Sequence, residues 1–228
     1  SSTAIHHLPV ASNIPKVEAD PDVVQAQLGM SEDDFVIGIF GSDHPSRLLS
    51  HARPAIAACA QEVDSCCVLY VGPDGPSVRT AIQPEVPFHD AGALSPDEVS
   101  RCFGVMDLYL APFRDGVSTR RGSFLTGLQH GVATATTRGD ETGSFLSSQH
   151  GEAFVAPPRR QRSEFVAHVR RLARRPGERQ ALGQDGQALY DEHFSWPTIA
   201  AQLRQILTDS QHEAGVPPAL ASVSSSEG

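Results

Sequence analysis

Hydrophobic residues come in short, uninterrupted runs that alternate with amphipathic segments. The run Phe35–Phe40 ends on Gly41, and the run Cys66–Val71 ends on Gly72. Apolar runs of this length without alternation are typical of parallel strands that are buried on both faces. Between the two runs, apolar residues recur at spacings of three and four from position 48 to 63, which predicts a helix. The pattern therefore predicts a unit of strand, loop and helix.

The same unit is repeated further along the chain. Ser95 is a typical helix N-cap residue, Pro96 suits the first helical position, and two acidic residues follow in the first turn. We expect further strands at residues 86–92, 107–113, 132–137 and 152–156, and helices at 78–83, 95–106 and 119–130. This alternation predicts an α/β fold with a doubly wound, mainly parallel, six-stranded Rossmann-like sheet.

The rest of the chain has a helical pattern. We expect C-terminal helices at 163–175, 178–193 and 197–208. Four arginines lie on the polar face of the first: Arg170, Arg171, Arg174 and Arg175. We interpret them as a solvated helix end and not as a nucleic-acid stripe, because cations complement the dipole there. Residues 210–228 have little to bury and are expected to form a flexible tail, which leaves 18–209 as the folded domain.

Composition and charge narrow the function classes. The chain has 228 residues, of which 39% are hydrophobic, enough for one large domain or two small ones. No apolar run approaches the roughly 20 residues of a membrane-spanning helix. The formal net charge of −9 argues against general attraction to nucleic acid or anionic lipid, so we expect no nucleic-acid partner and at most peripheral membrane association.

The cysteines and the start of the chain bear on its location. Four cysteines, at 59, 66, 67 and 102, lie in apolar stretches without the spacing of a zinc or redox pair. We interpret them as buried thiols of a cytoplasmic protein. The first residues lack a secretion signal and an initiator methionine, which indicates a processed or excised start. One lysine against seventeen arginines resembles the product of a GC-rich, bacterial genome.

Candidate chemistry lies in the loops that follow the strands, because ligands of open parallel sheets bind at the carboxyl ends of the strands. The sequence has neither the G-x-G-x-x-G fingerprint nor a P-loop, so another phosphate site is needed. Arg47 follows Gly41 at the expected start of a helix, from which a guanidinium can hold a diphosphate. Arg120 and Arg121 also precede a helix, where cations are unfavourable unless an anion shares the site.

In their order, the motifs resemble the C-terminal, nucleotide-sugar-binding domain of family 4 (group 1) retaining glycosyltransferases, which have the two-Rossmann-domain GT-B fold. The resemblance covers about residues 8 to 208 and is carried by the segments 8–15, 41–47, 71–76, 92–101, 106–112 and 194–200. Residues 1–17 are similar to the linker between the two domains of that family. The last of the matching segments contains Trp196, which we interpret as a core aromatic anchor of the final helix.

The resemblance implies a role for particular residues. Arg47 and Asp115 would be catalytic, Arg47 by stabilising the charge on the leaving diphosphate with help from Arg120 or Arg121. The backbone of residues 92–94 would meet the nucleotide base. The donor-binding residues would be Gly41, Ser42, Gly72, Gly92, Ala93, Leu94, Gly116, Val117, Ser118, Thr119, Arg120, Arg121 and Thr126.

One loop departs from the family pattern. Members usually carry two glutamates eight residues apart, one near the donor sugar and one near the ribose hydroxyls. Here Asp115 stands in place of the first and Thr126 in place of the second, eleven residues apart. Arg120, Arg121 and Ser123 are candidates for compensating phosphate contacts, since Ser42 replaces the first arginine of the family.

The function expected from the resemblance is transfer of a sugar from a nucleotide-diphosphate sugar to an unknown acceptor, with retention of configuration. It needs no cofactor and no metal, and the acceptor-binding N-terminal domain would come from the full-length chain or from another chain; without it we expect no activity. The alternatives are a non-catalytic nucleotide-sugar-binding or scaffolding domain and, less favoured, a nucleotide-sugar epimerase. His44 and His130 border the expected crevice, but we interpret them as structural.

Overall fold

The structure, a computed structural model, describes residues 8–213, and its centre is one parallel sheet. The five strands run in the order β3-β2-β1-β4-β5, so the order reverses between β1 and β4. All pairings are parallel, with Phe35 opposite Cys66 and Ile37 opposite Leu108. The strands are β1 (Phe35–Phe40), β2 (Cys66–Val71), β3 (Phe88–Asp90), β4 (Leu108–Ala111) and β5 (Ala133–Thr136). The predicted Rossmann-like α/β sheet is confirmed.

Helices connect the strands. They are α1 (Pro21–Gln27), α2 (Ala52–Ala60), α3 (Gly75–Ile82), α4 (Pro96–Gly104), α5 (Gly122–Gln129), α6 (Arg162–Arg174), α7 (Pro176–His193) and α8 (Trp196–Glu213), with short helical turns at Leu49–His51 (η1) and Phe145–Gln149 (η2). Ser95 caps α4 in a capping box with Glu98, as the sequence predicts. No helix in the described part of the chain is both long and apolar enough to cross a membrane.

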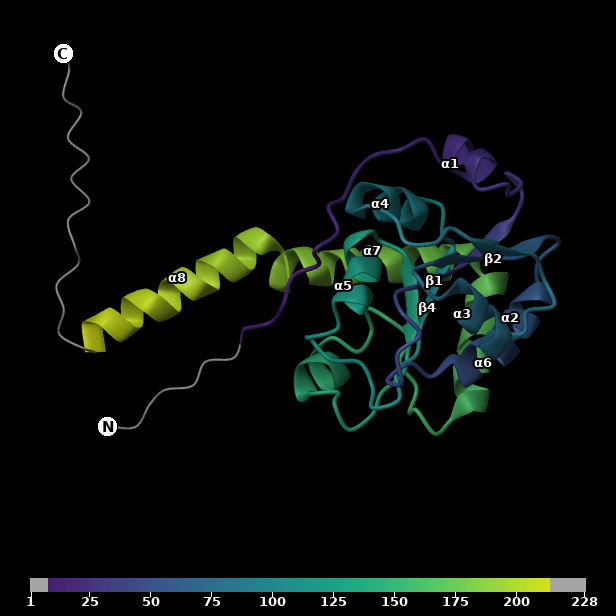
Figure 1. The fold of residues 1–228 in the computed structure, drawn as a ribbon. Helices are drawn as coiled ribbons and strands as arrows, with labels where there is room; N and C mark the ends of the chain where they lie inside the picture. Colours follow the sequence, from purple (N-terminus) through teal and green to yellow (C-terminus); the bar gives the residue numbers. More distant parts are fainter. Residues whose placement is uncertain (1–7, 214–228) are drawn as a thin grey trace, which may run out of the picture.

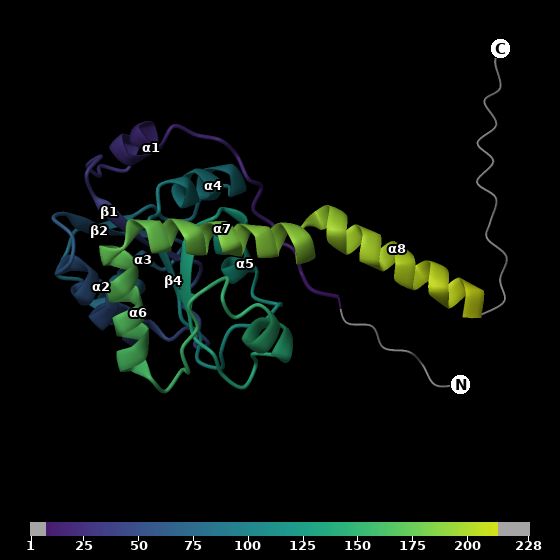
Figure 2. The same cartoon turned by 180° about the vertical axis from the view of Figure 1, so that it is seen from behind.

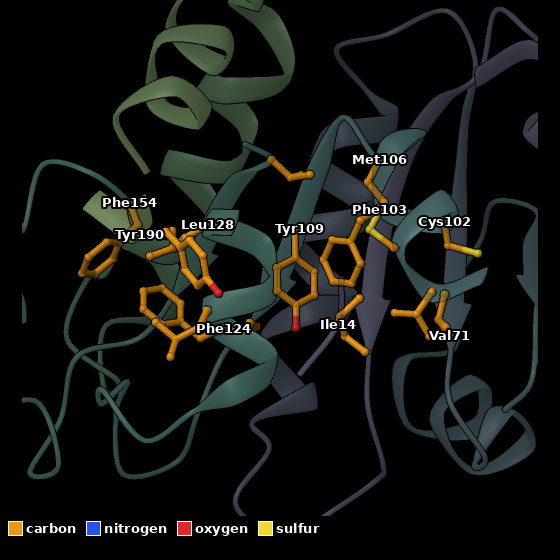
Figure 3. Close-up of a cluster of buried hydrophobic side chains, with 14 of the residues drawn as sticks. Ile14, Val71, Cys102, Phe103, Met106, Tyr109, Phe124, Leu128, Phe154 and Tyr190 are labelled. Carbon is orange, nitrogen blue, oxygen red and sulfur yellow. The ribbon is translucent and has the colours of Figure 1, made fainter. Parts of the chain in front are cut away.

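The strands separate two hydrophobic layers. Along β2, Cys67, Leu69 and Val71 contribute to the cluster beneath α1, α4, α5 and α7, while the alternate residues contribute to the cluster beneath α2, α3 and α6. Figure 3 shows the first cluster, with Phe103 and Tyr109 side by side at its centre. Their ring centroids are 5.1 Å apart in an edge-to-face arrangement. Both sheet faces are therefore covered, which explains why the strands contain uninterrupted apolar runs.

The four cysteines behave as predicted from their apolar surroundings. All are free and buried. Burial raises the pKa of the Cys59 thiol to about 12 and that of Cys102 to about 11. They are inert core residues in this structure.

The last helix corrects one interpretation. Both views show α8 projecting from the end of α7, away from the sheet (Figures 1 and 2). Trp196 is 62% exposed and is not a core anchor; its indole Nε1 donates a hydrogen bond to the Ser12 carbonyl oxygen at 3.0 Å. The core position belongs instead to its neighbour Phe194, which is 1% exposed. The four arginines at the C-terminal end of α6, Arg170, Arg171, Arg174 and Arg175, are exposed as expected and share Glu62 and Glu178 as ion-pair partners.

Three further elements differ from the sequence predictions. The expected sixth strand at 152–156 is reduced to an isolated bridge between Val155 and Ala135, with a second bridge between Pro158 and Arg138, because Pro157 and Pro158 cannot donate to a continuous ladder. The helix expected from position 119 begins at Gly122, since residues 118–121 form a turn closed by the Arg121 amide. Helix α1 was not predicted, although Asp20 and Pro21 are typical of a helix start.

Candidate functional site

Three glycines bring the exits of β1, β2 and β3 to one edge of the sheet. The Gly41 amide donates to the Val71 carbonyl at 2.9 Å, and the Gly72 amide donates to the Gly92 carbonyl at 2.8 Å. The Tyr70 hydroxyl adds a bond to the Gly41 carbonyl at 2.9 Å. The structure therefore places these three predicted donor-binding glycines side by side, at the end of the sheet where the sequence analysis expected ligands.

The loops that follow β1 and β4 are joined where the strand order reverses. The Leu48 amide donates to the Pro112 carbonyl at 3.0 Å, and the Arg114 amide donates to the Ser46 carbonyl at 2.7 Å. A bridge between Arg47 and Phe113 lies between these bonds. This topological switch point is the place where doubly wound sheets bind ligands, and both its loops belong to the predicted site.

Two arginines meet at this switch point. The guanidinium carbon of Arg47 lies 5.3 Å from the centroid of the Phe113 ring, and that of Arg121 lies 4.8 Å from it. Arg121 Nη1 also donates to Ser46 Oγ at 3.2 Å. Among the described residues, neither guanidinium forms an ion pair with a carboxylate. Two cations beside one ring, without a counterion, are chemically suited to hold an anion.

Arg47 is folded back over the end of β1. Its Nη2 donates to the Phe40 carbonyl, close above Gly41, whose φ of 104° is left-handed. Its Nη1 is buried and has no hydrogen-bond partner among the described residues. An unsatisfied guanidinium N–H costs about 1–3 kcal/mol. An anion that drew this group outward would remove that cost.

The first turn of α5 adds backbone donors to the same region. Its N-cap residue is Arg121, whose side chain makes no capping hydrogen bond, and the first turn contains no acidic residue. A helix N-terminus carries a partial positive charge. An arginine at this position is therefore unfavourable by itself and favourable only beside an anion.

Asp115 and Gly116 lie in the same loop but face another partner. Arg159 Nη1 contacts Asp115 Oδ1 at 3.1 Å, and Arg159 Nη2 contacts Asp140 Oδ2 at 2.7 Å. The Asp115 side chain is still 47% exposed. Gly116 has a left-handed φ of 89°, and a Cβ on it would stand 2.3 Å from the Gly139 amide nitrogen. Asp115 is thus an ion-paired residue with an accessible edge.

Thr126 and Val117 have no accessible surface in the structure. The Thr126 hydroxyl donates to the Gly122 carbonyl at 2.9 Å and lies 3.0 Å from Ser12 Oγ, so the N-terminal segment covers it. The structure therefore gives Thr126 no surface with which to contact ribose. Their neighbour Ser118 is 8% exposed.

The two histidines of the predicted crevice have structural partners. His130 Nδ1 donates to the Thr126 carbonyl at 2.8 Å, and its Nε2 accepts from Ser100 Oγ at 2.8 Å. Ser100 Oγ in turn accepts from the Val17 amide at 2.9 Å. His44 contacts Ser46 within its own loop. In the described part of the chain, no three His, Cys, Asp or Glu side chains are grouped so that they could hold a metal ion.

Residues 92–94 lie at the exit of β3. Gly92 has a left-handed φ of 70° and donates its amide to Asp90 Oδ1 at 3.0 Å, while Ala93 is exposed and Leu94 half-buried. Ser42 is exposed in the loop after β1, where Asp43 donates its amide to Asp74 Oδ2 at 2.8 Å. The acidic residues of these turns therefore bind backbone amides.

An open pocket of about 600 Å³ lies at the exits of β4 and β5. Residues 118–120 form one wall, and Arg120 pairs there with Glu141 at 2.8 Å. Arg120 therefore faces a different partner from Arg121. The remaining lining comes from segments that sequence reasoning did not assign to the site: Pro9, Gly143, Ser144, Phe145, Leu146, His193, Phe194 and Gln202. No motif marks them, because they meet only through folding.

The fold is similar to that of solved glycosyltransferase structures. The chain is similar to WaaG, a glycosyltransferase involved in lipopolysaccharide biosynthesis, with a TM-score of 0.67 and 15% identity over 86% of this chain and 55% of WaaG. It is similar to the C-terminal domain of LpcC, a group 1 glycosyltransferase from Francisella tularensis, with a TM-score of 0.62 and 12% identity over 82% of this chain and 99% of that domain. This is the fold of a group 1 glycosyltransferase domain.

A third similar structure contains ligands. Anabaena HepE in complex with UDP and glucose matches with a TM-score of 0.68 and 16% identity, over 88% of this chain and 55% of HepE. The chain thus spans about half the length of WaaG and HepE. No protein-family profile and no curated protein sequence matches it. The group 1 glycosyltransferase fold was expected from the order of the motifs, and the likeness at this level of identity concerns the fold.

Proposed function

We propose that this chain is the donor-binding domain of a family 4 retaining glycosyltransferase, which transfers a hexose from a nucleotide-diphosphate sugar. The observation that carries the proposal is the pair Arg47 and Arg121 against Phe113, without a carboxylate, at the switch point of the sheet. A diphosphate has the charge to satisfy both guanidinium groups and the first turn of α5. The bound UDP of HepE, on a similar fold, agrees with this choice.

The arginines would act mainly on the leaving group. As the bond between the sugar and the diphosphate breaks, negative charge grows on the diphosphate, and fixed cations stabilise it more in the transition state than in the ground state. We propose Arg47 and Arg121 for this role, because neither has a carboxylate partner among the described residues, whereas Arg120 pairs with Glu141. The exposed edge of Asp115 faces solvent at the same sheet edge and remains our candidate beside the donor sugar. We propose no metal and no cofactor.

Chemistry on an acceptor needs a second binding surface. Group 1 enzymes of this fold have an N-terminal acceptor domain, and the chain spans only about half of WaaG and HepE. We therefore propose that an acceptor domain, in the same full-length chain or in another, completes the enzyme in the cytoplasm. Nucleic acid is not a proposed partner, because the chain carries a net charge of −9.

A non-catalytic nucleotide-sugar-binding domain is the second candidate. It is favoured because the two residues at the positions of the glutamate pair are occupied otherwise: Thr126 is buried under Ser12, and Asp115 forms an ion pair with Arg159. The retained arginine pair supports donor binding under both proposals. A transfer assay with the acceptor domain present separates them, because only the first candidate predicts turnover.

Titration calorimetry with UDP, GDP and ADP sugars tests donor binding. We expect one of them to bind more tightly than millimolar, which corresponds to more than about 4 kcal/mol. Replacing Arg47 by Ala or Arg121 by Gln is expected to weaken that binding about tenfold or more, since each removes a charge-assisted contact.

Arg79→Gln is the matched control for this titration. Arg79 also lies against a phenylalanine ring, 5.7 Å from the centroid of Phe88, but it is in the last turn of α3. Its replacement is expected to leave the affinity unchanged. The proposal fails if no sugar nucleotide binds, or if Arg47→Ala binds the preferred nucleotide as well as the wild type does.

A further inference from the structure

The open pocket of about 600 Å³ beside β5 is separate from the arginine pair. The loop 118–121 forms a wall of both sites, but the side chains of its consecutive residues Arg120 and Arg121 point to different sites. Arg121 lies over Phe113 at the switch point, whereas Arg120 reaches Glu141 in the pocket. A ligand in the pocket is therefore divided from the switch point by the backbone of this loop.

The pocket has an apolar floor surrounded by polar groups. Phe145 packs edge-to-face on Phe194 with ring centroids 5.8 Å apart, and its centroid lies 5.1 Å from that of His193. The hydroxyl-bearing side chains of Ser118, Thr119 and Ser144 and the amide of Gln202 complete the lining. Volumes of roughly 300–1,000 Å³ with an apolar floor and few polar groups are usual for small-molecule sites.

Two polar side chains of the lining, those of Ser144 and His193, have little hydrogen bonding within the described residues. Ser144 is exposed at the N-cap position of η2, and its side chain makes no capping hydrogen bond. His193 Nε2 is buried and makes no hydrogen bond to any described residue, and its nearest carboxylate oxygen, Glu192 Oε1, lies 3.5 Å away. Polar atoms of this kind are normally satisfied by a ligand or by water.

The charge of the pocket selects the chemistry of its ligand. Arg120 and Glu141 neutralise each other at 2.8 Å, and the pocket lining contains no further Asp, Glu, Lys or Arg. A second phosphate would find no unpaired cation here, in contrast to the switch point. A saccharide fits better, because its ring presents an apolar C–H face to an aromatic floor and its hydroxyls bond to the polar rim.

We propose that this pocket binds a neutral saccharide that is not the sugar of the nucleotide, as part of the acceptor. The inference rests on the proposed function, because it is the transferase that needs a second carbohydrate. It assigns part of acceptor recognition to the described domain itself, through segments 141–146 and the junction of α7 and α8.

The substitution Gly143→Leu tests the proposal by filling the pocket. Gly143 lines the pocket, and a Cβ on it meets no atom within 4 Å, so a larger side chain projects into open space without a clash. Gly104→Leu is the matched control, since a Cβ there also meets nothing within 4 Å. Gly104 ends α4, and it lines a different pocket, beside Val105 and Met106.

Saturation-transfer NMR with methyl glycosides of glucose, galactose, mannose and N-acetylglucosamine measures saccharide binding. The protein is used alone and saturated with its preferred bare nucleoside diphosphate. At least one glycoside is expected to bind in both states. Gly143→Leu should weaken this binding about tenfold and Ser144→Ala about threefold, while Gly104→Leu leaves it unchanged and all three retain the nucleotide affinity.

Three results overturn the inference. The first is that no glycoside binds the wild type at millimolar concentration, and the second is that glycosides bind Gly143→Leu as well as the wild type. The third is that Gly143→Leu weakens binding of the sugar nucleotide but not of the bare nucleoside diphosphate, which would show that the pocket binds the donor sugar. Failure of the proposed function is read separately, because it appears as loss of nucleotide binding by the wild type.

Discussion

At the scale of single residues, Ser12 attaches the N-terminal segment to the helices that carry the site. Its amide donates to the Tyr190 hydroxyl at 3.3 Å, its side-chain oxygen lies 3.0 Å from Thr126 Oγ1, and its carbonyl accepts from Trp196. Ser12 is 1% exposed. One small polar residue thus joins α5, α7 and α8, and every one of these bonds is buried or partly buried.

Thr126→Val tests whether this contact is structural. The change removes a buried hydroxyl that bonds to the Gly122 carbonyl and contacts Ser12, and it keeps the shape of the side chain. We expect the free energy of unfolding to fall by about 1–2 kcal/mol in urea titrations, with unchanged nucleotide affinity.

Thr80→Val is the control, because Thr80 makes the same bond to the carbonyl four residues back, on the surface of α3. It is expected to change the stability by less than about 0.5 kcal/mol. Weaker nucleotide binding by Thr126→Val at unchanged stability would contradict the structural role and would support a contact between Thr126 and the ribose of the nucleotide.

His130 makes the stability depend on pH. Its Nδ1 must carry the proton, because the Thr126 carbonyl can only accept, and its Nε2 accepts from Ser100. Burial lowers the pKa of His130 below 6.5. The unfolded chain therefore binds the second imidazole proton at a higher pH than the folded chain does. The contribution of neutral His130 to the free energy of unfolding is complete above pH 6.5 and is lost as the pH falls below it.

His130→Gln tests this sign. The difference in free energy of unfolding between wild type and variant is expected to shrink as the pH falls from 7.5 to 5, by at most about 1.4 kcal/mol per pH unit. Denaturant titrations at each pH measure it, and the difference cancels the other titrating groups. If this difference in free energy of unfolding stays constant or grows toward low pH, the result would contradict a lowered pKa of His130.

At the scale of elements, α7 lies unusually close to the loop before β5. A Cβ on Gly183 would stand 2.1 Å from the Gly131 carbonyl oxygen. Because Gly183 has no side chain, the backbone of α7 can approach this loop closely. This close approach positions the end of α7, where Phe194 and His193 line the pocket.

Gly183→Ala is expected to lower the free energy of unfolding by roughly 1–3 kcal/mol, because backbone atoms must shift apart. Gly177→Ala, in the same helix, is the control, since a Cβ there meets nothing within 4 Å. It should be neutral or stabilising. Thermal unfolding of both variants measures the difference, and equal midpoints would show that α7 can move without cost.

The elements that the sequence predicts are those whose signals are local. The apolar runs at 35–40 and 66–71 and the capping pattern around Ser95 each specify their element within a few residues, and each is confirmed. The prediction of a sixth strand at 152–156 was wrong, because this apolar run has the composition of a strand but is followed by two prolines. The interpretation of Trp196 as a core anchor was wrong, because the burial of this side chain depends on partners far away in sequence.

At the scale of the whole molecule, sequence order predicts the sheet edge but not what the side chains do there. The three glycines and Arg47 could be placed at the edge because parallel strands all end on the same side. Which of Arg120 and Arg121 joins Arg47 could not be predicted, since it depends on the 118–121 turn and on Glu141, twenty residues later. The pocket beside β5 was missed for the same reason.

The charge distribution supports a local anion site on an acidic molecule. The net charge is −9, and the four arginines at the C-terminal end of α6 form ion pairs with two shared glutamates. Arg47 and Arg121 differ in having no carboxylate partner within the described residues. A bound diphosphate would thus be held by these two groups and by α5, with the surrounding negative charge opposing anions elsewhere.

A crystal structure of the chain with its preferred nucleoside diphosphate tests the central claim most directly. We expect difference density for the two phosphates at the switch point, with both Arg47 and Arg121 within hydrogen-bond distance and Arg47 Nη1 no longer without a partner. Density for the diphosphate elsewhere, with Arg47 still folded onto the Phe40 carbonyl, would contradict the account.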